Sequence, residues 1–251
     1  MEENNWLFLR GLGRERRHWL DFPEKFQAKF PNAKIEFLDF PGLGESIHEP
    51  TSLDLDSFVF KLRDRCSLVR EKKPFHILAL SFGGMVAMHW ASLYPNDFLK
   101  MVVVNSSAGN LNPWHERIQP RAIGIILNLF NPSEPTKKEE ILMNLLTRKP
   151  EQHHAAIQQW SSISKSCPLD WKVLLQQLWL SKKFEISNLK SPHIQVLFLA
   201  GLGDQLVNPV CTENLAKHWG AEPVYHPWAG HEITLDDPDW VLDQIKKMAG
   251  D

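Results

Sequence analysis

The sequence has few cysteines, no long apolar run and no excess of one charge. Its three cysteines, Cys66, Cys167 and Cys211, lie far apart without paired spacing, which favours a reduced compartment over a disulfide framework. The most apolar run, residues 122–130, is far shorter than the roughly 20 residues that a membrane-spanning helix needs. The N-terminus is acidic where a secretory signal would be basic. These absences predict a cytoplasmic protein without a membrane span.

The charge balance gives no reason to expect a nucleic-acid partner. The chain of 251 residues carries a net charge of −2 and has no long basic stripe. The densest positive cluster comprises Arg14, Arg16 and Arg17. This cluster is either a solvated helix face or a surface for an acidic partner or a phosphate-bearing substrate. A hydrophobic content of 43% is ordinary for a soluble enzyme of one large domain or two small ones.

Short apolar runs alternate with longer segments of helical pattern along most of the chain. The runs predict strands at residues 6–9, 35–38, 75–80, 101–104, 194–199 and 223–225. Helical patterns cover residues 19–30, 52–70, 82–93 and 239–248. Such alternation is typical of an α/β fold, in which helices cover a mostly parallel sheet.

The rhythm changes between residues 109 and 185. No convincing strand occurs there, while helical patterns, prolines and tryptophans accumulate. We expect a helical cap at 109–185, inserted into an α/β core formed by 1–108 and 186–251. The aromatic side chains either form the cap's own core or line a substrate pocket. The candidates for substrate contact are Trp114, Trp160 and Trp171.

The strongest signal for chemistry is the segment Ala-Leu-Ser-Phe-Gly-Gly at residues 79–84. An apolar strand runs directly into an apolar helix, with Ser81 at the join and small residues two positions to either side. A turn this tight pushes the serine hydroxyl out of the sheet, and the following helix N-terminus offers N–H groups to a developing oxyanion. Taken alone, the serine could equally be a helix N-cap.

This segment resembles the nucleophile elbow of the α/β-hydrolase family, usually Gly-x-Ser-x-Gly, with Ala79 in the place of the first glycine. The turn Leu-Arg-Gly-Leu-Gly at residues 9–13 resembles the family's oxyanion-hole turn, with Arg10 where histidine is usual. The glycine-rich loop at residues 39–46 is similar to the loop after the family's next strand. The resemblance implies that the backbone N–H groups of Leu12 and Phe82 hold the oxyanion.

Two later segments extend the resemblance. Asp204 lies in a glycine-rich turn after the fifth predicted strand, where the family carries its triad acid; the alternative for this residue is an Asx turn. His231 precedes the last helix, as the family's catalytic histidine does, and the chain order Ser, Asp, His is that of the fold. The resemblance implies that Ser81 is the nucleophile, His231 the general base and Asp204 the supporting acid, with no cofactor.

The resemblance also implies an α/β-hydrolase fold with a doubly wound, mostly parallel sheet. We expect about six strands, because the first predicted strand begins almost at the N-terminus. The layout is similar to small bacterial carboxylesterases, which include esterases that act on a pimeloyl methyl ester bound to acyl-carrier protein. It implies a small-molecule ester or thioester substrate, either free or bound to an acyl carrier, and the tryptophan-rich cap favours an apolar acyl part. The arginine cluster would then be a landing surface for the acidic carrier.

Other functions stay open at this stage. The same triad also serves lactonases, amide hydrolases and cofactor-free lyases, because one site geometry supports many reactions. A protein of another class, a non-catalytic ligand-binding protein on this fold, would not need all three triad groups. No pattern in the sequence sets the acyl length, the leaving group or the oligomeric state.

The remaining histidines suggest a metal site only weakly. The pairs are His153 with His154, and His226 with His231, and neither has a third ligand at helical spacing. We therefore expect no metal. The aspartates at positions 236 and 237 are expected to cap the final helix.

Overall fold

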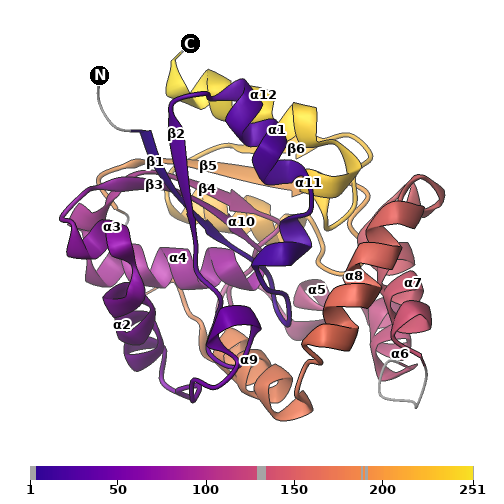
Figure 1. The fold of residues 1–251 in the computed structure, drawn as a ribbon. Helices are drawn as coiled ribbons and strands as arrows, with labels where there is room; N and C mark the ends of the chain where they lie inside the picture. The colour runs from indigo at the N-terminus through magenta and orange to yellow at the C-terminus, as the bar shows by residue number, and fades with distance from the viewer. Residues whose placement is uncertain (1–3, 129–133, 188, 190–191, 251) are drawn as a thin grey trace.

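A single parallel sheet organises the chain. The structure, a computed structural model, describes residues 4–128, 134–187, 189 and 192–250. Within these residues, six parallel strands lie in the order β2-β1-β3-β4-β5-β6 (Figure 1). The strands are β1 (Asn4–Leu9), β2 (Ala33–Phe37), β3 (Phe75–Leu80), β4 (Phe98–Val104), β5 (Gln195–Gly201) and β6 (Pro223–His226). The prediction of a mostly parallel sheet of about six strands is confirmed.

Helices cover both faces of this sheet. In β3, Ile77 and Ala79 pack on one face, and Leu78 and Leu80 pack on the other, as the alternation of strand side chains requires. Figure 1 shows α1 and α12 on one side of the sheet and α2 and α4 on the other. Burial on both faces explains why the strands read as continuous apolar runs. The covering helices are α1 (Phe22–Lys29), α2 (Leu55–Arg65), α3 (Ser67–Arg70), α4 (Phe82–Leu93), α10 (Val210–His218) and α12 (Pro238–Ala249).

Two predicted helices have different boundaries in the structure. The helix expected over residues 52–70 is broken at Cys66, whose extended backbone separates α2 from α3. The cause is Glu36, because its carboxylate accepts the N–H groups of Ser67 and Leu68 and so caps a new helix start. The helix expected over residues 19–30 begins at Phe22, after a short 3₁₀ turn η1 (Arg16–Trp19).

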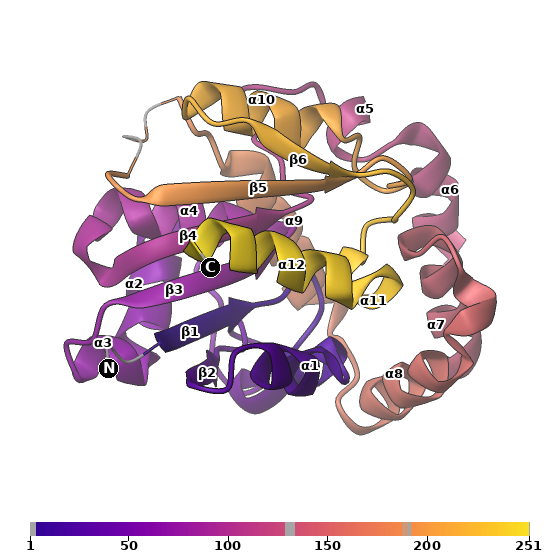
Figure 2. The same cartoon turned by 90° about the horizontal axis from the view of Figure 1, so that it is seen from above.

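The described residues between β4 and β5 form only helices and connecting segments. Figure 2 shows α6, α7 and α8 beyond the carboxyl ends of the strands. These three helices share a small apolar core that includes Met143 and Trp160, whereas α9 places Leu180 in the main core beside the sheet. Residues 129 and 130, the end of the most apolar run, lie outside the described residues. The helices are α5 (Trp114–Arg117), α6 (Pro120–Asn128), α7 (Pro135–Leu146), α8 (His154–Ser166) and α9 (Trp171–Lys183).

The three cysteines are all free. Cys66 and Cys211 are buried, and burial raises the pKa of each thiol to about 12, so neither forms a reactive thiolate near neutral pH. In the part of the chain that the structure describes, every helix is too short or too polar to cross a bilayer. The acidic residues 2 and 3 at the N-terminus lie outside that part.

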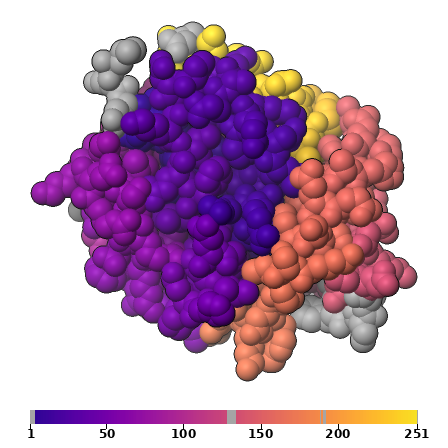
Figure 3. All heavy atoms as spheres, in the orientation of Figure 1, coloured from indigo at the N-terminus to yellow at the C-terminus, as the bar shows by residue number. Residues whose placement is uncertain are grey.

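The arginine cluster is not a single solvated face. Arg14 is buried, its guanidinium lies 4.4 Å from the centre of the Trp160 ring, and its Nη2 is 2.9 Å from the Glu139 carboxylate on α7. Arg16 and Arg17 stay partly exposed, and each pairs with a glutamate of the N-terminal region. The interpretation as a solvated face is therefore wrong for Arg14, because this side chain joins the core to the inserted helices. Figure 3 shows the N-terminal segment, in indigo, directly against the orange helices α8 and α9.

Candidate active site

Ser81 lies at the join between β3 and α4 in a strained backbone conformation. Its φ of 56° and ψ of −116° fall where residues other than glycine rarely occur. The Ser81 N–H donates to the Val104 carbonyl at 2.8 Å, which fixes the turn at the carboxyl end of the neighbouring strand β4. Strain of this kind persists only when the surrounding structure holds it, and it is concentrated at functional sites.

Small residues let the turn at residues 9–13 pack directly against this join. A Cβ at Gly83 would lie 2.6 Å from the Arg10 carbonyl oxygen and 2.8 Å from that of Leu9. A Cβ at Gly11 would lie 3.3 Å from the Cβ of Ser81. The first turn of α4 therefore touches the backbone of the preceding turn, and only glycine fits at position 83.

The two N–H groups expected to hold an oxyanion lie on these adjoining segments. Leu12 is half-buried in the turn, and Phe82 is the first residue of α4, where N–H groups have no acceptor within the helix. The Leu12 N–H has no hydrogen-bond partner among the residues that the structure describes. Both donors are therefore free to receive a negative oxygen beside Ser81.

The predicted base and acid form a buried hydrogen-bonded pair. The His231 Nδ1–H donates to the Asp204 Oδ2 at 2.7 Å, and both residues are 3% exposed. The other oxygen of Asp204 accepts the N–H groups of Leu206 at 2.8 Å and Val207 at 3.0 Å. Burial disfavours the imidazolium, but the charge and hydrogen bond of Asp204 outweigh it and raise the pKa of His231. Because Nδ1 is engaged, Nε2 is left as the basic nitrogen.

Asn105 is a site residue that sequence reasoning missed. It follows β4 with a φ of 46°, a conformation that asparagine tolerates better than most residues. Its amide group donates to the carbonyls of His231 at 2.8 Å and Gly230 at 3.1 Å, and its oxygen accepts the Gly201 N–H at 2.9 Å. Asn105 therefore connects the ends of β4 and β5 to the loop that carries the histidine. The available signal was an asparagine directly after an apolar strand.

The inserted helices contact each part of the site. The Gly13 N–H donates to the Gln177 side chain of α9 at 2.8 Å. The Glu232 N–H, next to the histidine, donates to the last-turn carbonyl of α7 at 2.9 Å. The Gln119 amide, just before α6, donates to the backbone carbonyl of Asp204 at 2.8 Å. The turn at residues 9–13, the loop that carries His231 and the turn that carries Asp204 are thus each bonded to a different inserted segment.

The three tryptophans expected near the substrate are not gathered in one place. Trp160 is fully buried in the core shared by α6, α7 and α8, as the alternative of a cap core expects. Trp114 and Trp171 are 66% and 57% exposed. A contact between any of the three and a substrate stays a prediction.

The two aspartates after the histidine have different roles. Asp237 accepts the Trp240 N–H at 3.1 Å and caps α12, which confirms that prediction. The prediction was wrong for Asp236, which ends α11 (Ile233–Asp236). Its carboxylate accepts the N–H groups of Gly230 at 2.7 Å and Arg148 at 3.1 Å, because it is buried between the histidine loop and the inserted helices.

The histidine pairs have ordinary polar partners. His226 accepts the Ala229 N–H through Nδ1 at 2.9 Å and lies 3.2 Å from Asp237 through Nε2. His153 lies 3.3 Å from Asp236. Across residues 4–128, 134–187, 189 and 192–250, no three histidine, cysteine or acidic side chains are arranged to hold a metal ion.

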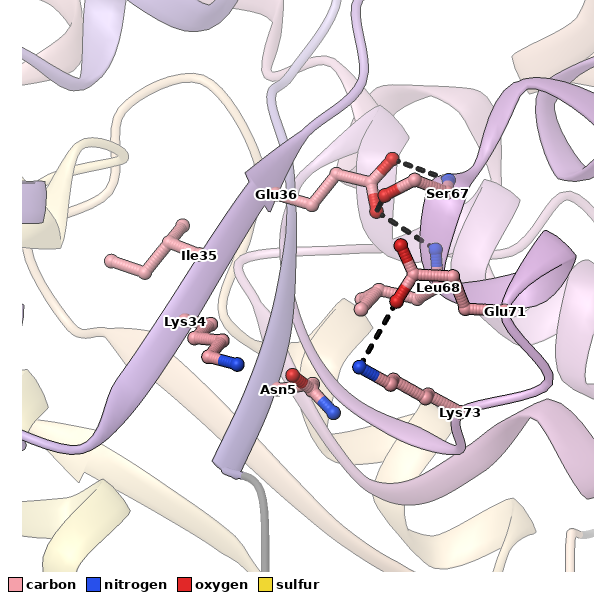
Figure 4. A pocket seen from close by; sticks show the side chains of 8 residues that line it. All are labelled: Asn5, Lys34, Ile35, Glu36, Ser67, Leu68, Glu71 and Lys73. Carbon is pink, nitrogen blue, oxygen red and sulfur yellow. Dashed lines mark hydrogen bonds and ion pairs between the residues drawn. The ribbon is translucent and has the colours of Figure 1, made fainter.

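A hollow of about 250 Å³ lies at the opposite end of the strands from Ser81 (Figure 4). Its lining includes Asn5 and Lys34, which lie at the amino ends of β1 and β2, whereas Ser81 follows the carboxyl end of β3. Within it, the Glu36 carboxylate accepts the Ser67 hydroxyl at 2.7 Å and caps α3. These contacts are structural, and the hollow is separate from the candidate active site.

Ser81, the adjoining turn at residues 9–13 and the buried Asp204–His231 pair all follow the carboxyl ends of parallel strands. The model of the Alpha/beta hydrolase family matches residues 6–244, which is nearly the whole chain. The chain belongs to the α/β-hydrolase family. Family membership supports hydrolase activity, and the resemblance inferred from the sequence is confirmed at this level.

Curated relatives match parts of this α/β-hydrolase chain. Monoacylglycerol lipase ABHD6 of Homo sapiens is 31% identical over 105 residues, which cover 39% of this chain and 29% of that protein. The Mus musculus protein of the same name is 30% identical over 148 residues, which cover 54% of this chain and 42% of that protein. The chain thus spans less than half the length of these relatives.

Solved structures of this fold match nearly the whole chain. The esterase RhEst1 from Rhodococcus sp. ECU1013 has a TM-score of 0.73 and 18% identity, with 98% of this chain and 90% of that chain covered. The 2-hydroxy-6-oxo-6-phenylhexa-2,4-dienoate hydrolase of Rhodococcus sp. strain RHA1 has a TM-score of 0.76 and 19% identity, with the same coverage. At these identities, the likeness establishes the fold alone.

Proposed function

We propose that this chain is a serine hydrolase that cleaves a carboxylic ester or thioester with an apolar acyl group. Ser81 is the nucleophile, His231 the general base and Asp204 the acid that orients it. The N–H groups of Leu12 and Phe82 form the oxyanion hole. The reaction proceeds through an acyl-enzyme and uses no cofactor.

Acylation begins when the Ser81 hydroxyl oxygen attacks the substrate's carbonyl carbon and its proton passes to Nε2 of His231. The carbonyl electron pair moves onto the oxygen, which accepts hydrogen bonds from Leu12 and Phe82. Asp204 stabilises the imidazolium without taking its proton. The tetrahedral intermediate then breaks its bond to the leaving alcohol or thiol, which receives the proton from the imidazolium.

Deacylation repeats these steps with water. His231 takes a proton from a water molecule as the water oxygen attacks the acyl carbon. The second tetrahedral intermediate releases the carboxylic acid, and Ser81 recovers its proton from His231. None of these four proton transfers requires a metal or a redox group, so the residues named above are sufficient for the complete cycle.

The observation that carries the proposal is the backbone conformation of Ser81. A glycine would adopt its φ of 56° without strain, and packing alone gives no reason for serine there. A strained residue that presents a hydroxyl beside free N–H donors is the arrangement that acyl transfer needs. The buried His231–Asp204 bond of 2.7 Å supplies the matching base.

The substrate class follows from the relatives and from the inserted segment. The partial matches to two monoacylglycerol lipases favour an ester of an apolar acyl chain. We further propose that residues 109–185 act as the cap of the site, since inserted segments contact the oxyanion turn, the base loop and the acid. Arg14 cannot contribute to a landing surface for an acyl carrier, because it is already paired and buried.

The test combines ester hydrolysis with covalent labelling. Wild type is expected to hydrolyse p-nitrophenyl esters and to gain the mass of one fluorophosphonate adduct, and Ser81→Ala is expected to lose both. Ser92→Ala, at the far end of the same helix, is the matched control and should behave as wild type. A folded wild type without hydrolysis or adduct, or an adduct that persists in Ser81→Ala, would refute the proposal. Comparing acetyl, butyryl and octanoyl esters gives the acyl preference.

A further inference from the structure

Arg10 takes part in a buried ion pair with Glu232. Arg10 is 3% exposed and Glu232 2%, and the guanidinium donates from Nη2 to Oε1 at 2.7 Å and from Nη1 to Oε2 at 3.1 Å. The same guanidinium lies 4.7 Å from the centre of the Trp19 ring. The pair is therefore bidentate, and the aromatic ring restricts where the guanidinium can lie.

The two ends of this pair belong to different parts of the site. The Arg10 backbone contacts the first turn of α4 at Gly83 and leads within two residues to the Leu12 N–H. Glu232 directly follows His231. A single side-chain contact thus connects the oxyanion turn to the loop that carries the base, although the two residues are 222 positions apart.

Stability alone is a poor explanation for such a pair. Removing two charges from water is costly, and a buried ion pair is often no more stabilising than packed apolar side chains of similar volume. A bidentate arginine–carboxylate pair does, however, fix distance and orientation better than apolar packing. Catalysis is sensitive to both, since a displacement of about 1 Å can cost about 100-fold in rate.

We propose that Arg10 and Glu232 are positioning residues that set the oxyanion donor Leu12 relative to the base His231. This inference rests on the proposed function. Arg10 occupies the place where the family usually has histidine, and Glu232 supplies the counter-charge that a buried arginine needs there. The pair acts through the oxyanion turn and the base loop and does not itself touch the reacting atoms.

The pair also acts on the charge of the base. The charged groups that influence His231 are Asp204, Glu232 and Arg10. Asp204 and Glu232 raise the pKa of the imidazole, and Arg10 lowers it, while burial also lowers it. Removing Glu232 leaves the effect of Arg10, which lowers the pKa of His231. Removing Arg10 leaves the effect of Glu232, which raises that pKa.

The experiment compares Glu232→Gln, Arg10→Met and the apolar double variant Arg10→Met with Glu232→Leu. We expect kcat for a p-nitrophenyl ester to fall by about 10- to 100-fold in each folded variant, with KM within about 3-fold of wild type. The inflection of kcat/KM against pH should move to lower pH in Glu232→Gln and to higher pH in Arg10→Met. Arg10→Lys keeps the charge but not the bidentate geometry and should recover only part of kcat.

The chain contains a matched control pair. Arg63 donates to Asp97 at 2.7 and 3.0 Å and lies 4.2 Å from the centre of the Tyr94 ring, so it has the same chemistry. Asp97 lies at the amino ends of the strands, far from the candidate active site. Arg63→Met should change stability while kcat and the pH profile stay those of wild type.

The double variant Arg10→Met with Glu232→Leu covers the case in which a lone buried charge prevents folding, because it leaves no unpaired charge.

Two results would overturn the inference. One is a folded double variant with wild-type kcat and pH profile, and the other is an equal loss of kcat in Arg63→Met. Titration of the histidine ring signals by NMR tests the effect on His231 without any substrate. Fluorophosphonate labelling distinguishes failure of the ion-pair inference from failure of the proposed function. An unlabelled wild type removes both ideas, whereas a labelled wild type with an unaffected double variant removes only the role of the ion pair.

Discussion

At the scale of single residues, the candidate site depends on groups held in conformations that they would not adopt alone. Ser81 has a positive φ, and Asp204 and His231 are almost completely removed from water. The sequence singles out these three because each follows a strand in a recognisable small-residue context, and their catalytic roles stay a proposal. It could not reveal the partner of Arg10, because Glu232 becomes its neighbour only through the fold.

The Asp204–His231 pair makes a prediction about pH. The base must be neutral to accept a proton, so kcat/KM should rise with pH through the pKa of His231, which lies above its ordinary value of 6.5. In Asp204→Asn the group that raises this pKa most is gone and burial remains, so the inflection should move to lower pH. We expect kcat to fall by about 10⁴-fold, because the imidazole loses its correct tautomer. Steady-state ester hydrolysis between pH 5 and 9 measures both effects.

The control for this variant is Asp239→Asn, which removes an exposed carboxylate at the start of α12. Its pH profile should match wild type. An Asp204→Asn enzyme that keeps its rate and inflection would show that another carboxylate supports the base.

At the scale of elements, the sheet and the helix α4 position the site. The strands could be predicted from sequence because both faces of the sheet are covered and their residues are apolar throughout. The break at Cys66 could not be predicted, because a carboxylate from position 36 on another strand causes it. The role of Asn105 could not be predicted either, because it depends on hydrogen bonds to the distant loop that carries His231.

The contact between α4 and the turn at residues 9–13 requires a residue without a side chain at position 83. In Gly83→Ala the new Cβ would lie 2.6 Å from a backbone oxygen that cannot rotate away. We expect a loss of about 1–3 kcal/mol in the free energy of unfolding, together with reduced ester hydrolysis. Urea unfolding followed by circular dichroism measures the first effect.

A second glycine provides the comparison. Gly124 lies within α6, and a Cβ there would have no heavy atom within 4 Å, so Gly124→Ala should stabilise the helix by up to about 1 kcal/mol. If both variants shifted the unfolding midpoint alike, the close approach at Gly83 would not be the cause.

At the scale of the whole molecule, the inserted helices and the α/β core are joined by buried charge. Glu139 on α7 pairs with Arg14 of the N-terminal region and accepts the Ser164 hydroxyl of α8 at 2.5 Å. The sequence predicted an inserted helical segment from its lack of strands. It could not predict this junction, since both interpretations of the arginine cluster placed it on the surface.

Removing one charge of this junction should be costly. In Glu139→Gln the Arg14 guanidinium stays buried without a counter-charge, and we expect a loss of about 3–5 kcal/mol in the free energy of unfolding. The exposed pair Arg16–Glu45 is the control, and Glu45→Gln should cost about 1 kcal/mol or less. Equal urea midpoints for the two variants would mean that the junction does not hold the helices to the core.

The order of the strands has a consequence for biosynthesis. In the proposed site, Ser81 and the turn at residues 9–13 come from the first 84 residues, whereas Asp204 and His231 follow β5 and β6. Chains are made and begin to fold from the N-terminus, so the elbow can form while the later strands are still in the ribosome. A serine without its base is a poor nucleophile. On the triad proposed above, the nascent chain therefore carries an inactive half-site, and hydrolysis becomes possible only when the last part of the chain has docked.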